Sequence, residues 1–247
     1  MKIIADTHTH TIASTHAYAT ITEMVTEAAR LGLYALAITD HGPSMPGAPQ
    51  IWYFHNLGAV PSTFMGVRVL KGVEANIADF DGSLDLSEYA LSKLEWVVAS
   101  IHDVTLDQSK TQVSFESCTE LYLNAAKNPY INVIGHCGTP AYKFDYERVL
   151  PELGANGKLI EINDSAFKNN KSNVPNCIEI AKICKRRSIP IIVNTDAHFT
   201  TQLGRFDGTI KMLEEIGFPE ELVVNSSVER FEKCLSERGI ALRDNNN

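Results

Sequence analysis

Ile3-Ile4-Ala5-Asp6-Thr7-His8-Thr9-His10 is a short apolar run that leads into two histidines. The run from Ile3 to Ala5 predicts a buried strand. Alternate side chains of an extended chain point to the same side, so His8 and His10 should share one face at the end of that strand. Two imidazoles placed in this way can hold a metal ion. A pair of surface histidines fits the same short pattern, and the rest of the sequence decides between the two interpretations.

Apolar runs and helical patterns alternate along the chain. Strands are expected at residues 3–5, 34–39, 67–73, 94–100, 131–135, 158–162 and 189–194, and 222–224 is a candidate for one more. Helices are expected between Thr22 and Gly32 and at residues 116–127, 146–153, 175–187, 208–216 and 228–238. Near-continuous apolar runs such as residues 34–39 are typical of strands that are buried on both faces. The alternation predicts an α/β fold, either a parallel barrel or a doubly wound sheet.

Two parts of the chain do not follow this alternation. Residues 43–66 contain scattered prolines and the aromatic group Trp52-Tyr53-Phe54. A segment this long is either a functional lid or a short helix that packs its aromatic side chains on the core. The last residues, 243–247, are expected to be disordered. Because no linker or low-complexity stretch interrupts the chain, residues 1–242 are expected to form one domain.

Charge and cysteine usage exclude several classes of protein. The formal net charge is −8 and no basic run extends beyond residues 185–187, which disfavours binding to nucleic acid or to an anionic membrane. No stretch approaches the roughly 18 uninterrupted apolar residues of a membrane span. The five cysteines form no C-x-x-C pair, and Cys177 and Cys184 fall on one face of a predicted helix, as packed thiols would. A cytoplasmic protein is therefore expected.

Side chains that commonly bind metals gather at the ends of the predicted strands. His8, His10, His41, Glu74, His102, His136, Asp196 and His198 lie at or just past a strand end, and His16 follows in the loop after the first strand. The carboxyl ends of parallel strands carry the chemistry in both candidate folds. A closed barrel brings all of these ends around one mouth, whereas a doubly wound sheet separates its loops into two diverging sets. The barrel is favoured for this reason.

The number and type of these side chains point to more than one metal ion. One catalytic zinc usually takes three protein ligands, so this set suits two or three ions, especially if a carboxylate bridges. Imidazole and oxygen donors without paired thiolates fit zinc, manganese or iron. Some of the histidines could instead donate hydrogen bonds to the ligands or be satisfied core groups.

Four segments together resemble the motifs of the polymerase and histidinol phosphatase (PHP) superfamily. They are Asp6-Thr7-His8-Thr9-His10 with Ser14-Thr15-His16-Ala17-Tyr18, Ile38-Thr39-Asp40-His41-Gly42, Gly72-Val73-Glu74-Ala75-Asn76 and Asp196-Ala197-His198. Within the superfamily the chain most resembles the free-standing YcdX-like phosphatases, whose phrase around residues 13–18 recurs here. The resemblance implies a distorted seven-stranded (β/α)7 TIM-like barrel with three divalent metal ions, zinc first and manganese or iron as alternatives.

The resemblance also implies how the ligands divide among the ions. The first ion would take His8, His10, Glu74 and Asp196, the second His16, His41 and His198, and the third His102 and His136 with Glu74 as the bridge. The sequence departs from its relatives at Cys137, where many have proline. Adjacent residues of an extended chain face opposite ways, so Cys137 is expected to be packed while His136 binds metal.

These features predict a metal-dependent phosphoesterase that acts on a small phosphomonoester. Clustered divalent ions neutralise phosphate charge and lower the pKa of bound water to near 7, so no serine or cysteine nucleophile is needed and no catalytic side chain is assigned. Lys168 and Arg205, in loops after the sixth and seventh strands, are candidates for phosphate binding, although either could be a solvated surface charge. A metal-dependent nuclease, an amidohydrolase and a non-catalytic metal-binding module are the alternatives, and a homo-oligomer stays open.

Overall fold

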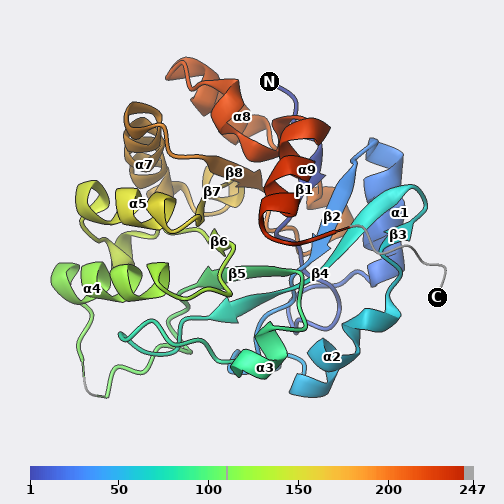
Figure 1. The fold of residues 1–247 in the computed structure, drawn as a ribbon, viewed down its shortest axis with the longest axis horizontal. Helices are drawn as coiled ribbons and strands as arrows, with labels where there is room; N and C mark the ends of the chain where they lie inside the picture. Colours follow the sequence, from blue (N-terminus) through green and yellow to red (C-terminus); the bar gives the residue numbers. More distant parts are fainter. Residues whose placement is uncertain (110, 242–247) are drawn as a thin grey trace.

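Seven parallel strands form a nearly closed barrel in the computed structural model, which describes residues 1–109 and 111–241 (Figure 1). In order around the sheet they are β1 Ala5–Asp6, β2 Ala35–Ile38, β4 Val67–Asn76, β5 Trp96–Ser100, β6 Val133–Ile134, β7 Leu159–Asn163 and β8 Ile191–Asn194. The short strand β3, Thr63–Phe64, pairs antiparallel with β4. The predicted barrel is confirmed, because every parallel strand follows its neighbour in the sequence with no reversal of order.

Several contacts join the first strand to the last, among them hydrogen bonds from Thr7 to Asn194 Oδ1 and from Thr195 to the carboxylate of Asp6. At the carboxyl ends, Thr9 and Ala197 form a parallel bridge, and the amide of His10 donates to the carbonyl of Ala197 at 2.8 Å. At the amino ends, the side chain of Asn225 is inserted between the strands. Its Nδ2 donates to the carbonyls of Ala5 and Val193, at 2.8 and 2.6 Å, and its Oδ1 accepts from the amide of Val193.

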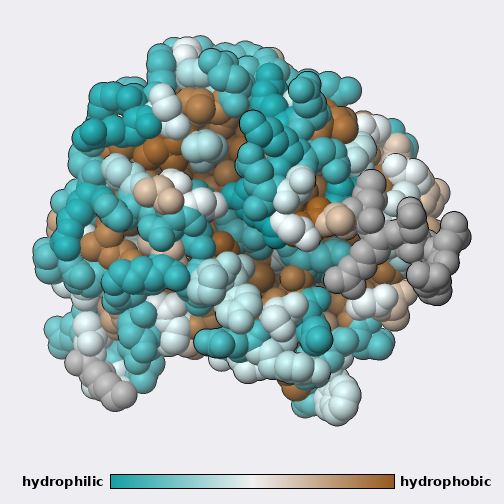
Figure 2. Space-filling view, in the orientation of Figure 1, coloured by the Kyte–Doolittle hydropathy of each residue, from teal (hydrophilic) through white to brown (hydrophobic). Residues whose placement is uncertain are grey.

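Helices surround the sheet. They are α1 Ile21–Leu31, α2 Ile51–Asn56, α3 Glu88–Leu91, α4 Phe115–Ala126, α5 Tyr146–Ala155, α6 Ser165–Lys168, α7 Val174–Arg187, α8 Asp207–Glu215 and α9 Val228–Glu237. Helix α9 lies across the amino ends of the strands, where buried Phe231 packs against Trp96 with ring centroids 6.3 Å apart. This end of the barrel is therefore filled with apolar side chains. The polar and charged candidate residues lie at the opposite end, where the strands have their carboxyl ends. Figure 2 shows that the outer surface over these helices is mostly hydrophilic.

The two ends of α1 show how the local sequence determines where a helix begins and ends. The cap is Thr20 and not Thr22 as predicted, because Thr20 is followed three residues later by Glu23 and the two side chains form a capping box. The predicted stop at Gly32 is confirmed, and this residue has φ 70°, a conformation that glycine adopts without strain.

The segment 43–66 is a packed element. Helix α2 and the 3-10 turn Leu57–Ala59 bury Phe54 and Leu57 in an apolar cluster that also contains Val73. The hydroxyl of Tyr53 donates to buried Asp40 at 2.6 Å. This confirms the interpretation as a short helix that packs its aromatic side chains, although Trp52 remains 75% exposed.

The expected strand at 222–224 is wrong. Two 3-10 turns, Glu220–Leu222 and Val224–Ser226, occupy this segment, and only Val223 forms a single bridge, to Ile191. The side chain of Asn225 hydrogen-bonds to both edge strands, and its backbone carbonyl accepts from the amide of Ile4 at 2.9 Å. The other predicted strands are observed with ends that shift by up to a few residues. The tail at 243–247 lies outside the described residues, and within those residues no helix is long and apolar enough to cross a membrane.

Candidate metal centre

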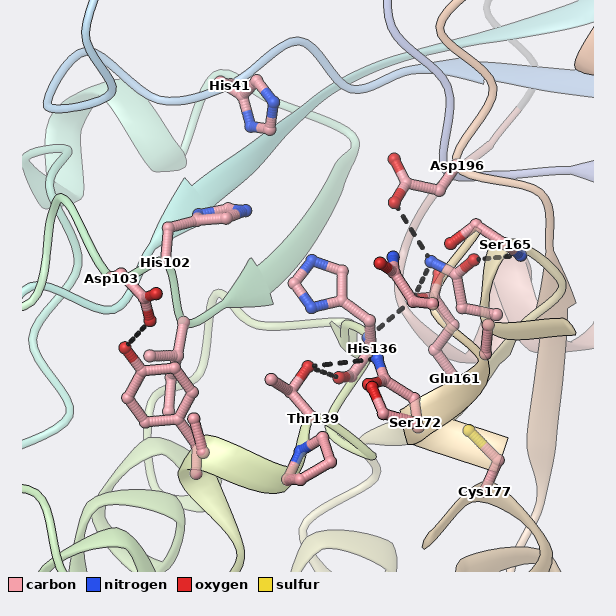
Figure 3. Close-up of a pocket in the computed structure, with 18 of the residues that line it drawn as sticks. His41, His102, Asp103, His136, Thr139, Glu161, Ser165, Ser172, Cys177 and Asp196 are labelled. Carbon is pink, nitrogen blue, oxygen red and sulfur yellow. Dashed lines mark hydrogen bonds between the residues drawn. The ribbon is translucent and has the colours of Figure 1, made fainter. Parts of the chain in front are cut away.

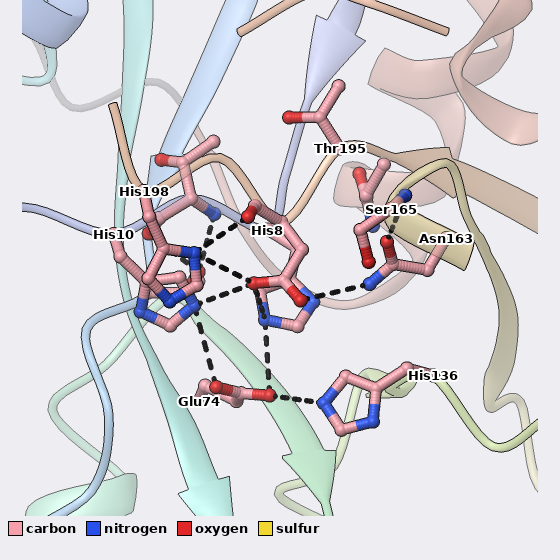
Figure 4. Close-up of polar contacts among 12 residues, drawn as sticks. His8, His10, Glu74, His136, Asn163, Ser165, Thr195 and His198 are labelled. Carbon is pink, nitrogen blue, oxygen red and sulfur yellow. Dashed lines mark hydrogen bonds and ion pairs between the residues drawn. The ribbon is translucent and has the colours of Figure 1, made fainter. Parts of the chain in front are cut away.

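All nine predicted ligands lie together at the carboxyl ends of the strands. Figure 4 shows His8, His10, Glu74, His136 and His198 of this group. Glu74, near the end of β4, is in the middle of the group and is completely buried. Its Oε1 lies 3.2 Å from His8 Nε2, 2.9 Å from His136 Nε2 and 3.5 Å from His102 Nε2. Its Oε2 lies 2.6 Å from His41 Nδ1 and 3.5 Å from His10 Nε2. Each carboxylate oxygen therefore faces a separate set of imidazoles, which is the arrangement that a bridging carboxylate needs.

The second carboxylate of the group is Asp196, just past β8. Its Oδ1 lies 3.1 Å from His10 Nε2 and 3.6 Å from His8 Nε2. On the outer side of the group, His16 Nε2 lies 3.2 Å from His41 Nε2, and the ring of His198 stacks on that of His16 at 4.6 Å between centroids. Asp196 has φ 55°, a left-handed conformation that is uncommon for a residue with a Cβ and that occurs here at a functional turn.

Within the part of the chain that the structure describes, ligand atoms of three groups converge to within 4.8 Å of one another. The groups are His8, His10 and Glu74; His10, His41 and His198; and His41, Glu74 and His102. Several of the atoms that converge are buried and make no contact with hydrogen-bond geometry, although some lie within ion-pair distance of one another: His8 Nε2, His10 Nε2, His41 Nδ1, Glu74 Oε2, Asp196 Oδ1 and His198 Nε2. Buried polar atoms are nearly always satisfied, so unpaired lone pairs aimed at common points fit divalent cations.

The protonation states of Glu74 and His10 suit metal binding, whereas the carboxylates of Glu161 and Glu74 outweigh burial and raise the pKa of His8. Burial disfavours the ionised form of Glu74, but the imidazoles of His8, His102 and His41 outweigh it and lower the pKa of Glu74 well below its ordinary range. Burial, reinforced by charge on His41, lowers the pKa of His10 well below its ordinary value. An ionised carboxylate and a neutral imidazole are the forms that bind a metal ion.

Hydrogen bonds on the far side of several imidazoles fix how the rings point. His8 Nδ1 donates to Glu161 Oε1 at 2.8 Å, and His102 Nδ1 donates to Asn76 Oδ1 at 2.8 Å. His198 Nδ1 donates to the carbonyl of Asp196, also at 2.8 Å. In each case Nε2 is left facing the centre. A partner on the second ring nitrogen is typical of histidines that ligate metals, because it selects the tautomer and holds the ring.

Glu161 is a buried functional candidate that sequence reasoning missed. It lies in the middle of β7, and besides His8 it accepts from the amide of His136 at 2.7 Å and from Asn194 Nδ2 at 2.9 Å. The signal was present in the sequence Leu159-Ile-Glu-Ile-Asn163, where a glutamate occupies an inward position of an otherwise apolar strand. A charged residue is almost never fully buried unless it is paired.

Asp40 organises the loop that carries His16. Its Oδ1 accepts from the amide of Thr11 and from Ser14 Oγ, both at 2.7 Å, and its Oδ2 accepts from Tyr53 of α2. Ser14 Oγ in turn accepts from the amide of His41. One buried carboxylate therefore ties the loop after β1 to the loop after β2 and to α2.

The two predicted phosphate-binding residues lie apart from this buried group. Lys168 lines a cavity of about 310 Å³ that is also lined by His16, Asp196 and His198. Its Nζ lies 2.5 Å from Asp164 Oδ2 and donates to the carbonyl of Arg205 at 2.6 Å. The side chain of Arg205 is exposed and does not line that cavity.

Cys137 is packed, as predicted. It is 2% exposed and belongs to the main apolar core. The preceding residue, His136, has φ 24°, and its amide donates to Glu161. This tight turn directs the imidazole toward Glu74 while the thiol next to it is buried among apolar side chains.

A family model and relatives of similar length identify the family of this chain. A model of the PHP domain matches residues 6–165. A "probable phosphatase" of Acetivibrio thermocellus is 44% identical over 98% of this chain and 99% of its own length, and one of Caldanaerobacter subterraneus subsp. tengcongensis is 47% identical over 96% and 93%. Among solved structures, a histidinol phosphate phosphatase of Lactococcus lactis, complexed with zinc, L-histidinol and phosphate, aligns with a TM-score of 0.61 at 18% identity, over 89% of this chain and 95% of that one. The chain belongs to the PHP domain family.

Proposed function

We propose that the protein is a metal-dependent phosphoesterase that hydrolyses a small phosphomonoester at a centre of three divalent ions. The observation that carries the proposal is the set of unpaired, buried nitrogen and oxygen atoms that converge around Glu74. The "probable phosphatase" relatives, which match the chain over nearly its whole length, support the same activity. The histidinol phosphate phosphatase, a zinc-bound neighbour in fold, supports zinc as the first choice of metal and a small phosphorylated substrate.

The proposed ions divide among the ligands as follows. His8, His10, Glu74 and Asp196 hold the first, His16, His41 and His198 the second, and Glu74, His102 and His136 the third. Its role as the bridge between the first and third ions is supported by Oε2, which lies 3.5 Å from His10 Nε2, and by Oε1, which lies 2.9 Å from His136 Nε2 and 3.5 Å from His102 Nε2. Nitrogen and oxygen donors fit zinc, and manganese or iron are the alternatives.

Divalent ions in this centre supply charge neutralisation for the phosphate and an acidified water for attack. The side chains of the protein would hold the ions in position. Glu74 would bridge two of them, Glu161 orients the ring of His8, and Asn76 orients the ring of His102. Cys177 is near enough to line the neighbouring cavity, but burial raises the pKa of its thiol to about 12, so it is not a nucleophile at neutral pH.

Lys168 is proposed to contact the phosphate from the smaller cavity. Its ammonium group already pairs with Asp164, which is completely buried, and the carbonyl of Arg205 fixes its position. Arg205 remains a candidate through its exposed side chain. The five cysteines are all free and buried, which supports a reducing compartment such as the cytoplasm.

The test is turnover of an aryl phosphate by purified protein that is first stripped of metal and then reconstituted with zinc, manganese or iron. We expect turnover that disappears with a chelator and returns with metal. Cleavage of single-stranded DNA or RNA, or of an amide such as a dihydropyrimidine ring, without phosphomonoester turnover would favour the nuclease or the amidohydrolase. Metal binding without any turnover would favour a non-catalytic module.

A further inference from the structure

The cavity beside the candidate metal centre is large enough for more than a phosphate group. It has a volume of about 690 Å³, and its lining includes His102, His136, Thr139, Tyr142 and Asn173. Figure 3 shows Asp103 and Ser172 on opposite sides of this space, with His136 between them. A phosphomonoester with its phosphate at the centre would therefore place its alcohol half in this cavity.

Apart from histidines, the described charged side chains around this cavity are all negative. None of the described residues that line it is lysine or arginine, and its charged side chains other than histidine are the carboxylates of Asp103, Glu161 and Asp196. Glu161 and Asp196 face the candidate centre, where His8 lies beside both. Asp103 is different because it is exposed at the mouth of the cavity and belongs to none of the candidate ligand groups.

Asp103 is held in place by its neighbour across the cavity. The hydroxyl of Tyr142 donates to Asp103 Oδ1, while Oδ2 has no protein partner within the described residues. Tyr142 is 4% exposed, and burial, together with the adjacent carboxylate, raises the pKa of its phenol. The phenol therefore stays a neutral donor, and one oxygen of a fixed carboxylate remains free to interact with whatever fills the cavity.

Asp103 lies next to the candidate centre. It follows His102 directly in the chain, and the side chains of both residues line the same cavity. The alcohol half of a phosphomonoester whose phosphate lies beside His102 would therefore share this cavity with the carboxylate. A negative group on that alcohol would be repelled, and a positive group would be attracted.

We propose that Asp103 determines which alcohols the enzyme accepts: phosphomonoesters whose alcohol half carries no second anionic group, with an ammonium group preferred. This inference rests on the proposed phosphatase function and adds the charge of the substrate to it. Asp103 acts on specificity and is not required for the attack on phosphorus.

Three substrates of equal length test the proposal: phosphoethanolamine, hydroxyethyl phosphate and phosphoglycolate, which end in an amine, a hydroxyl and a carboxylate. We expect kcat/KM to fall in that order, by about three- to tenfold at each step, as expected for one partly screened charge pair. In Asp103→Asn the kcat/KM values of the three substrates should become similar. In Asp103→Glu, which keeps the negative charge, the order of the parent should persist. The matched control Glu221→Gln, which removes the same charge from an exposed site outside the cavity, should leave the order unchanged.

Binding provides a readout that does not depend on turnover. We expect calorimetry to show that the parent binds aminoethylphosphonate most tightly, hydroxyethylphosphonate less tightly and phosphonoacetate most weakly. In Asp103→Asn the three affinities should be similar. If the protein turns over aryl phosphate but the order is flat in the parent, or survives in Asp103→Asn, the inference on Asp103 is wrong and the phosphatase function stands. If no phosphomonoester is hydrolysed under any metal, the proposed function fails and this inference fails with it.

Discussion

His8 Nδ1 donates a 2.8 Å hydrogen bond to Glu161 Oε1, and both side chains are buried in the barrel. Burial disfavours ionisation of Glu161, but the charge and the hydrogen bond of His8 outweigh it and lower the pKa of Glu161. The carboxylate therefore stays ionised and holds the imidazole with Nε2 facing Glu74 and Asp196. The carboxylate of Glu161, which is not one of the proposed ligands, therefore holds the orientation of a proposed ligand, His8.

Replacing Glu161 with Gln should weaken metal binding although no ligand is lost. The amide keeps one acceptor but brings a donor toward groups that themselves donate, the amide of His136 and Asn194 Nδ2. We expect metal affinity at the site of His8 to fall about 10- to 100-fold, as is typical for loss of such a partner. Competitive titration with a chromogenic chelator measures the change. Affinity equal to that of the parent would show that the ring holds its orientation without Glu161.

Glu74→Gln should remove more than one equivalent of metal. The substitution keeps the shape of the side chain but replaces a ligand oxygen with a nitrogen that only donates. If Glu74 bridges, two sites weaken together and nearly all phosphatase activity is lost, whereas His102→Ala weakens mainly one site. Elemental analysis of the two variants beside the parent, with melting curves to verify folding, distinguishes these outcomes. Full metal content in Glu74→Gln would exclude the bridge.

Removal of the metal should lower the melting temperature. Cations that bind only the folded state stabilise it by about 2.7 kcal/mol per site at a free concentration one hundred times Kd. For a domain of this length that corresponds to a shift of roughly 5–10 °C. Scanning calorimetry of the chelated and the reloaded protein, with metal content verified in both, checks the expectation. Coincident melting curves would contradict it.

Lys158 should make stability depend on pH far from the metal centre. Its side chain is 5% exposed, its Nζ donates to the carbonyls of Asn128 and Ile131, and burial lowers its pKa from 10.5 to about 8. Between these two values the unfolded chain holds a proton that the folded chain has lost, so the contribution of Lys158 to stability rises with pH. The free energy of unfolding of the parent minus that of Lys158→Met should therefore increase from about pH 8 to about pH 10. A difference that is constant over this window would show that Lys158 does not titrate there.

The sequence could predict much of this structure because its patterns are local. An apolar run such as residues 34–39 is typical of a buried strand, and the histidines that end successive strands must meet if the sheet closes. Glu161 was missed because nothing local separates a glutamate that orients a ligand from one that is merely tolerated, and only the distance to His8 reveals its role. The segment 222–224 was predicted wrongly because two 3-10 turns bend the chain there and only Val223 pairs with a strand, while the side chain of Asn225 supplies the hydrogen bonds to the neighbouring strands.

Asn225 has a consequence for how the protein is made. It hydrogen-bonds to Ala5 in the first strand and to Val193 in the last, and the Thr9–Ala197 bridge joins the same two strands near the proposed ligands. During synthesis His8 and His10 leave the ribosome long before Asp196, His198 and Asn225. The barrel cannot close around the candidate metal centre until residues 196–225 have been made, so the first proposed ligands remain without their partners for most of the synthesis of this domain.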